Sequence, residues 1–189
     1  RISKMVEQIF HTACGGKIEA ATDTRLHLSA HQGVIDYLPE AMNKISLPND
    51  LKKLCQVIDL GRIIGRSSLL ETVQIELNTS CWFAKRQERL GPSRVILDID
   101  PTETSVISII ANAITPDRYE LVSAWFGAFA PKEPWDTTLI SEPSAFKESL
   151  DFWCCHALAY NHEGMDEPFE STWEEIINSH YKPDRGGIK

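Results

Sequence analysis

The spacing of apolar residues changes along the chain and separates a helical part from a strand-rich part. Up to about residue 60, apolar residues recur every three and four positions, which is the spacing of one helix face. Predicted helices cover residues 2–13, 29–45 and 51–58. From residue 68 onward, apolar and polar residues alternate instead, which indicates half-buried strands. Predicted strands cover residues 68–77, 81–86, 94–100, 104–114 and 119–126.

Helical spacing returns after the strands. A stripe formed by Phe146, Leu150, Trp153, Ala157 and Tyr160 predicts a helix that carries His156. A last short helix is expected over about residues 170–181. Helices followed by an antiparallel sheet of four or five bent strands, then one or two helices, indicate an α+β fold. We expect one α+β domain over residues 1–162, with a helical part at 1–60 and the sheet and helix at 61–162. An acidic helix or tail would follow at 163–189.

Composition excludes some classes of protein. The chain has 189 residues, of which 42% are hydrophobic and 24% charged, as in ordinary soluble domains. No apolar run approaches the roughly 18 residues that cross a bilayer, so we expect no membrane partner. The opening residues are too polar for a signal peptide, which favours the cytoplasm, and Arg1 in first place indicates a fragment or a processed chain.

Cysteine and metal-ligand patterns predict no cofactor. The five cysteines are an odd number without a CxxC motif, so reduced thiols are expected. No Cys/His spacing resembles a zinc site. Asp98 and Asp100 alternate on one strand face, as metal carboxylates can, but no third ligand accompanies them. We therefore expect neither a metal nor another cofactor.

The net charge of −8 argues against broad nucleic-acid binding, which needs Lys and Arg to neutralise phosphates. The charge is uneven, however. Residues 62–94 hold six basic and three acidic side chains, whereas residues 163–189 hold seven acidic and three basic ones. Two interpretations remain: a focused anion site masked by an acidic tail, or two solvated surfaces.

Two candidate sites for chemistry lie in the second half of the chain. His156 sits at the flank of the helical stripe, where an imidazole with a pKa near 6.5 suits proton transfer. It can equally be a packed histidine bound to a backbone carbonyl. Ser123 and Trp125 share one face of a strand, where a hydroxyl can bind a phosphate oxygen or a ribose 2′-OH. A half-buried serine without a role has the same pattern.

Two groups of basic residues are candidate phosphate binders. Arg62 and Arg66 flank a glycine-bearing turn, and arginine can bind phosphate through two nitrogens at once. The other group combines cations with aromatic rings, as base stacking requires, and consists of Trp82, Phe83, Lys85, Arg86 and Arg89. Exposed arginines at a helix end and a solvated hairpin end are the respective alternatives.

Four segments together resemble a known superfamily: GRIIGRSSLLET, RVILDID, RYELVSAWFGAFAPKEPWD and SLDFWCCHALAY. They are similar to the barnase–EndoU–colicin–RelE superfamily of toxin ribonucleases, especially its branches in phage and bacterial conflict systems. The similarity spans residues 61–160. It implies helices before a bent antiparallel sheet. It also implies Ser123 in place of an active-site Thr or Ser, His156 as general acid or base, and Arg62 and Arg66 as phosphate binders.

The resemblance implies a toxin-like, metal-independent endoribonuclease acting on RNA such as tRNA or mRNA, with a possible cognate antitoxin or immunity protein. A base would remove the proton of the ribose 2′-OH, and an acid would protonate the leaving 5′-oxygen. His156, Ser123 and Arg66 are the predicted catalytic residues. Arg62, Lys85, Arg86, Arg89 and Trp125 are the predicted substrate-binding residues. Glu71 and Tyr119 are candidates for the second proton-transfer group.

Two other functions fit the sequence. A non-enzymatic interaction protein, such as an immunity protein, an antitoxin or a phage accessory factor, suits the acidic charge because such a surface blocks basic partners. An enzyme acting on another nucleotide, for example a transferase that uses NAD, is the third interpretation.

Overall fold

The chain divides into two compact units. The computed structural model describes residues 6–12, 16–21, 33–45 and 53–181. Unit 1 comprises Arg1–Ser67 and Glu103–Phe129, and unit 2 comprises Ser68–Thr102 and Ala130–Lys189. The boundary expected at residue 162 falls inside unit 2. Each unit contains its own five-stranded sheet, and β4 (Gly65–Ser67) pairs with β8 (Thr102–Thr104) in a further two-stranded sheet.

The α+β class is confirmed, but the expected order of helices followed by one antiparallel sheet is wrong. The strands of unit 1 follow the order β1-β2-β10-β9-β3, and β2 and β10 run parallel. Unit 1 is built from β1 (Val6–His11), β2 (Lys17–Ala21), α2 (Val34–Asn43), β3 (Lys53–Asp59), β4 (Gly65–Ser67), β9 (Val106–Thr115) and β10 (Arg118–Phe126), and β8 (Thr102–Thr104) begins at the end of unit 2.

Two of the predicted N-terminal helices are strands. In β3, Leu54 and Ile58 are buried while Cys55 and Val57 are exposed, which is an alternating pattern. A spacing of four residues fits one helix face and one strand face equally well, so the sequence did not decide between them. The pairing of all seven β3 residues with β9 decides for the strand. In β1, likewise, Phe10 is buried and Ile9 is exposed.

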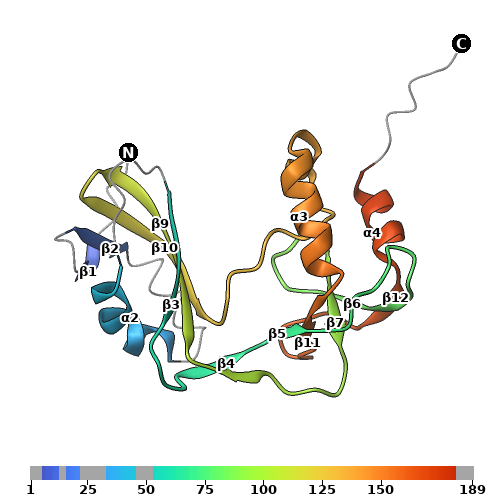
Figure 1. The fold of residues 1–189 in the computed structure, drawn as a ribbon, viewed down its shortest axis with the longest axis horizontal. Helices are drawn as coiled ribbons and strands as arrows, with labels where there is room; N and C mark the ends of the chain where they lie inside the picture. The colour runs from blue at the N-terminus through green and yellow to red at the C-terminus, as the bar shows by residue number, and fades with distance from the viewer. Residues whose placement is uncertain (1–5, 13–15, 22–32, 46–52, 182–189) are drawn as a thin grey trace, which may run out of the picture. The chain divides into compact units, whose positions relative to one another are not determined.

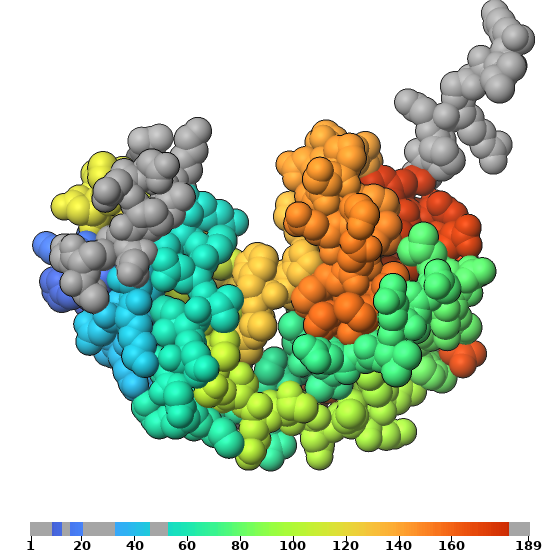
Figure 2. Space-filling model, in the orientation of Figure 1, coloured from blue at the N-terminus to red at the C-terminus, as the bar shows by residue number. Residues whose placement is uncertain are grey.

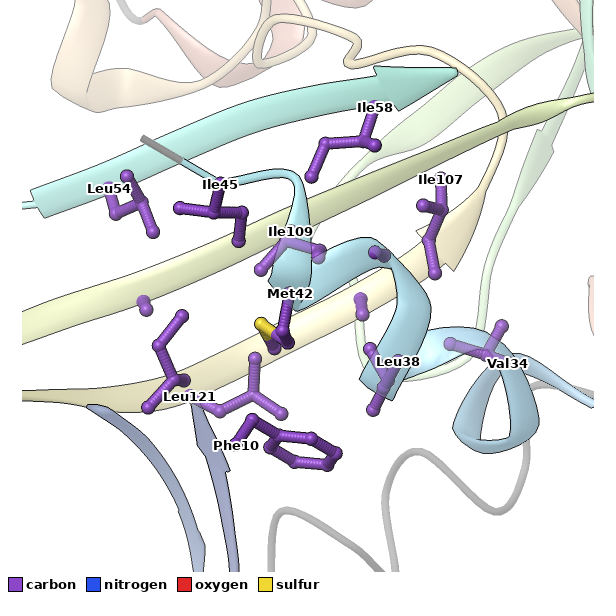
Figure 3. Packing of buried hydrophobic residues seen from close by; sticks show 14 of the residues in the cluster. Phe10, Val34, Leu38, Met42, Ile45, Leu54, Ile58, Ile107, Ile109 and Leu121 are labelled. Carbon is purple, nitrogen blue, oxygen red and sulfur yellow. The ribbon is translucent and has the colours of Figure 1, made fainter. Parts of the chain in front are cut away.

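The helix predicted over residues 29–45 is present as α2 and packs on the sheet. Helix α2 buries Val34, Leu38, Ala41 and Met42, which lie on one face at helical spacing. Figure 3 shows Leu38 and Met42 of this face close to residues of the strands, among them Leu121. The serine expected to cap this helix, Ser29, lies outside the described residues.

The pairing of β9 with β10 determines which face of the sheet carries Ser123 and Trp125. The two strands are joined by Pro116 and Asp117, as expected, and Gly127, with φ 103°, directly follows the end of β10. A register shift between Leu121 and Ser123 brings Ser123 opposite Ile110, and Trp125 opposite Ser108. Ala124 between them is buried in the core, so Ser123 and Trp125 point to the sheet face opposite α2.

Unit 2 pairs a second mixed sheet with three helical segments (Figure 1). Its strands follow the order β12-β6-β7-β11-β5, with β7 and β11 parallel. The elements are β5 (Leu69–Glu71), β6 (Cys81–Lys85), β7 (Pro92–Ile96), the 3₁₀ helix η1 (Thr137–Ser141), α3 (Pro143–Trp153), β11 (His156–Ala159), β12 (Phe169–Ser171) and α4 (Trp173–His180). Among the described residues, no helix is both long and apolar enough to cross a membrane.

Three tryptophans form the centre of unit 2. Trp135, Trp153 and Trp173 are each at most 5% exposed. Every indole N–H donates to a backbone carbonyl, at 2.7 Å to Pro92, 3.1 Å to Pro131 and 3.1 Å to Trp153 respectively. A buried indole without such a partner would lose a hydrogen bond to water, so these contacts allow large rings to fill the core.

Candidate functional site

The first predicted catalytic residue, His156, does not lie on a helix. Helix α3 ends at Trp153, and His156 begins strand β11, opposite Glu71 of β5. The expectation of a helix through residue 160 is therefore wrong. Ala157 and Leu158 continue the apolar stripe in sequence, but they are buried by pairing with β5 and β7. Tertiary pairing overrode the helical spacing here.

The imidazole of His156 is held by the end of α3. Its ring stacks on Phe152 with centroids 3.8 Å apart, and Nδ1 lies 2.9 Å from the Phe152 carbonyl oxygen. A carbonyl only accepts hydrogen bonds, so Nδ1 carries the proton, and Nε2 is left as the acceptor. The Cys155 sulfur is 3.4 Å from the same Nδ1. The side chain thus contacts a backbone carbonyl and an aromatic ring.

A buried arginine that the sequence did not single out fixes the start of β11. Arg94 is 7% exposed, and its Nη1 donates to the Thr72 hydroxyl at 3.0 Å and to the carbonyls of Cys154 and His156 at 3.4 and 3.3 Å. The alternating pattern of residues 94–100 would place Arg94 on the outer face of a half-buried strand. Four of the five residues of β7 are buried, however, so its arginine is enclosed. The guanidinium reaches the backbone of His156, not its imidazole.

Ser123 and Trp125 lie in unit 1. Ser123 is half-buried, and the Trp125 indole N–H donates to the Ala128 carbonyl at 3.2 Å. Trp125 also lies against Phe129, with centroids 6.1 Å apart. Both residues share the face of the sheet that α2 leaves uncovered, so this face presents a hydroxyl and two aromatic rings.

The arginines of unit 1 differ in their surroundings. Arg62 binds both carboxylate oxygens of Glu40, at 2.7 and 2.6 Å, and lies over the Tyr37 ring. This hydrogen bonding and the charge of Arg62 hold the pKa of Glu40 below its ordinary value. Arg66 is exposed on β4. The guanidinium of Arg62 is therefore already occupied by a carboxylate.

The basic cluster of unit 2 is partly used within the fold. Arg86 binds the buried Glu133 at 2.5 Å, and the Ser93 hydroxyl donates to the same carboxylate oxygen at 2.6 Å. The Arg86 Nε is buried and has no hydrogen-bond partner among the residues that the structure describes. Lys85 and Arg89 are exposed and form no ion pair with the described part of the chain. Arg86 therefore stabilises the hairpin of β6 and β7, and two of the three predicted cations face solvent.

The predicted catalytic residues are divided between the two units. Ser123 and Arg66 belong to unit 1, and His156 belongs to unit 2. The predicted substrate-binding residues divide in the same way, with Arg62 and Trp125 in unit 1 and Lys85, Arg86 and Arg89 in unit 2. Neither unit alone assembles the predicted set.

An apolar pocket of about 290 Å³ lies between η1, α3 and α4 of unit 2. Its volume is at the lower end of the roughly 300–1,000 Å³ of small-molecule sites. Figure 2 shows α3 in orange and α4 in red next to each other at the surface. The lining residues are Leu139, Ile140, Pro143, Phe146, Ile177 and Tyr181.

The pocket offers apolar surface and little hydrogen bonding. The Tyr181 hydroxyl is the polar side-chain group of the lining, and it donates to the Asp136 carbonyl at 2.5 Å. Burial, together with the nearby Asp136 charge, raises the pKa of Tyr181. The hydroxyl therefore stays neutral and engaged, and the pocket has no free group that could orient a polar substrate.

Carboxylates lie beside pocket residues at the start of both helices. Glu142, the N-cap residue of α3, directly precedes the lining residue Pro143, and Glu174 precedes the lining residue Ile177 by one turn of α4. Both glutamates are exposed, and neither forms an ion pair within the described ranges. Lys147 on α3 is bound to Asp151 at 2.6 Å. The rim is thus acidic.

The sequence carried a signal for this pocket that we did not use. Leu139-Ile140 and Ile176-Ile177 are adjacent apolar pairs in helical segments. Neighbours on a helix point about 100° apart, so both members of a pair rarely reach one core. Leu139 and Ile176 are in fact buried, whereas Ile140 is 64% exposed.

The net charge of −8 lies entirely in unit 2. Unit 2 contains 17 acidic and nine basic side chains, and unit 1 contains ten of each. Within the described residues, no cluster of three or more His, Cys, Asp or Glu side chains is arranged to hold a metal ion. Comparison with protein-family models, with curated proteins and with solved structures gave no match to this chain.

Proposed function

We propose that this chain is a non-enzymatic protein-binding module, and that unit 2 binds a basic protein partner. The observation that carries this proposal is the division of charge, because unit 2 holds the whole excess of negative charge while unit 1 is neutral. Negative charge attracts a basic protein, and it repels nucleic acids and anionic lipid surfaces.

Several basic side chains of unit 2 already have partners within the fold, which supports the same proposal. Arg86 and Lys147 are bound to Glu133 and Asp151, and Arg94 is buried among hydroxyl and carbonyl groups. Phosphate binding needs cations that are accessible and unpaired, which in the described part of unit 2 leaves Lys85, Arg89 and the Thr138-bonded Lys132. The accessible carboxylates of unit 2 are a better match for lysine and arginine side chains of a partner.

Fluorescence anisotropy with peptide probes tests the proposal. A labelled lysine-rich peptide should bind the full chain at low salt, and a glutamate-rich peptide of equal length should not. Glu142→Gln with Glu174→Gln should weaken binding roughly threefold to tenfold, since each lost charge pair is exposed. The matched control in unit 1, Asp36→Asn with Glu103→Gln, removes as many carboxylates and should leave the affinity unchanged. Equal effects of the two double variants, or no binding of the lysine-rich peptide, would refute the proposal.

A second candidate function is the metal-independent endoribonuclease, supported by the His156 geometry and by the resemblance given above. With Nδ1 protonated, Nε2 is the basic nitrogen, and it has no hydrogen-bond partner in the described part of the chain. Exposed Lys85 and Arg89 near the 37% exposed Trp82 would contact RNA.

RNA cleavage in EDTA distinguishes the two functions. The ribonuclease should release fragments with 2′,3′-cyclic phosphate ends, and His156→Ala should abolish cleavage. His162→Ala, which changes an exposed histidine of the same unit, is the control and should cleave normally. RNA that stays intact with the wild-type chain removes this second candidate.

A further inference from the structure

We propose that the pocket of η1, α3 and α4 binds one apolar side chain from a basic segment of a protein partner. This inference rests on the proposed function, because it names the place where unit 2 would anchor the partner. The occupant follows from two properties of the pocket, its apolar lining and its acidic rim.

The lining selects an apolar group. The carbon-rich side chains of Leu139, Ile140, Phe146 and Ile177 face the space, and the Tyr181 hydroxyl is already bonded to the Asp136 carbonyl. A polar ligand would lose its hydrogen bonds to water without replacement, which costs free energy. A leucine, isoleucine or phenylalanine side chain loses nothing comparable and buries its own apolar surface.

Ile140 marks the opening of the pocket. It is 64% exposed although it lines the cavity, so part of this apolar side chain contacts water. A partner that covers Ile140 gains the free energy of burying that surface. Single apolar anchors that fill such pockets supply much of the affinity in protein interfaces.

The rim selects positive neighbours for that anchor. Glu142 is the N-cap residue of α3 and directly precedes the lining residue Pro143, and Glu174 lies one turn of α4 from the lining residue Ile177. Lysine or arginine residues beside the apolar anchor would pair with these carboxylates. The partner segment therefore combines a central apolar residue with flanking cations.

A double-mutant cycle tests the anchor with a defined probe. One lysine-rich peptide carries a single central leucine, and a second carries alanine there. The wild-type full chain should bind the leucine peptide about tenfold more tightly, the effect of one well-buried side chain. Ile140→Ala should reduce this preference to about threefold or less.

The control variant is matched in residue type and exposure. Ile63 of unit 1 is 62% exposed, close to the 64% of Ile140, and Ile63→Ala should keep the tenfold preference. Both substitutions are at exposed positions, so loss of folding does not complicate the comparison. Methyl resonances of Ile140 and Ile177 should also shift on addition of the leucine peptide, and that of Ile63 should not.

The outcomes separate this inference from the proposed function. If the wild-type chain binds both peptides equally and in a salt-dependent manner, the pocket is not the anchor, although unit 2 still binds a basic partner. A leucine preference that Ile140→Ala leaves intact overturns the anchor in the same way. If neither peptide binds at low salt, the proposed function fails and the inference fails with it.

Discussion

Unit 1 and unit 2 each combine one five-stranded mixed sheet with helix, but they differ in net charge. Unit 1 balances its charges, and two of its arginines, Arg62 and Arg118, are paired with Glu40 and Glu19. Unit 2 keeps an excess of eight negative charges. Like charges on one compact body repel and destabilise it. The excess therefore does not serve the fold of unit 2, and it is the basis of our proposal that unit 2 binds a partner of opposite charge.

The cores differ as well. The core of unit 1 is aliphatic, with the buried Tyr119 among its strands, whereas tryptophans dominate the core of unit 2. The tryptophans of unit 2 have satisfied indole groups, but the Tyr119 hydroxyl is buried without a partner in the described residues. This contrast leads to predictions of opposite sign for the two units.

The largest expected effect is in the core of unit 2. Trp173→Ala should lower the free energy of unfolding by about 3–5 kcal/mol, because it leaves a cavity beside Phe83 and Trp153. Urea unfolding followed by circular dichroism measures the change. Trp82→Ala, which removes a ring that is 37% exposed, is the control and should cost much less. Equal losses for the two variants would contradict the packing described for unit 2.

The second-largest effect should come from the ion pairs, because loss of the buried pair in unit 2 should destabilise the protein more than loss of the exposed pair in unit 1. Arg86→Met leaves the buried Glu133 carboxylate with only the Ser93 hydroxyl, so unfolding free energy should fall by about 3 kcal/mol. Arg62→Met removes a partner from the exposed Glu40, which water then solvates, so little change is expected. Chemical denaturation of both variants makes the comparison. A larger loss for Arg62→Met would reverse our assignment of the buried pair.

Acid should weaken unit 2 through Asp136. Burial alone would raise the pKa of this carboxyl, but hydrogen bonds from the Thr138 hydroxyl and amide, with the charges of Lys132 and Arg89, hold the pKa below its ordinary value. A pKa lowered by folding stabilises the folded state above about pH 4 and loses this contribution as pH falls through the folded-state pKa.

Urea unfolding at a series of acidic pH values measures this loss. Asp136→Asn keeps a residue that can cap η1 and should make stability less dependent on pH below about 4. Asp98→Asn, at an exposed carboxylate of the same unit, should retain the wild-type dependence. Identical acid profiles for the wild-type chain and Asp136→Asn would exclude this role.

The smallest effect should be a gain in unit 1. Tyr119→Phe removes a hydroxyl that is buried without a partner among the described residues, so the unfolding free energy should rise by up to about 1 kcal/mol. Tyr37→Phe, at a half-buried tyrosine of α2, is the control and should change stability little. A clear loss of stability in Tyr119→Phe would show that the hydroxyl is bonded.

Sequence patterns predicted an element correctly where the spacing of its apolar residues fitted a strand but not a helix, or a helix but not a strand. The β9–β10 hairpin was predictable because Pro116 and Asp117 interrupt two long β-branched and aromatic runs. The patterns were wrong for β1 and β3, where spacings of four residues suit a helix and a strand alike. They were also wrong for His156, because the pairing of β11 with β5 and β7 joins segments distant in sequence.

The candidate sites show the same limit. His156, Ser123 and Arg66 are chemically suitable residues, but sequence spacing does not show that they belong to different units. The division of charge was calculable from the sequence only once the unit boundaries were known. The apolar pairs Leu139-Ile140 and Ile176-Ile177 indicated apolar surface outside the core, but not that it forms one pocket, because η1, α3 and α4 meet only through tertiary packing.

The most direct test of the central claim is an amide chemical-shift titration of the full ¹⁵N-labelled chain with a lysine-rich peptide. We expect the shifts to concentrate in unit 2, around η1, α3 and α4, and to disappear at high salt. Unit 1 amides should stay in place. Shifts that concentrate instead around Ser123 and Trp125, or that spread evenly over both units, would contradict the assignment of partner binding to unit 2.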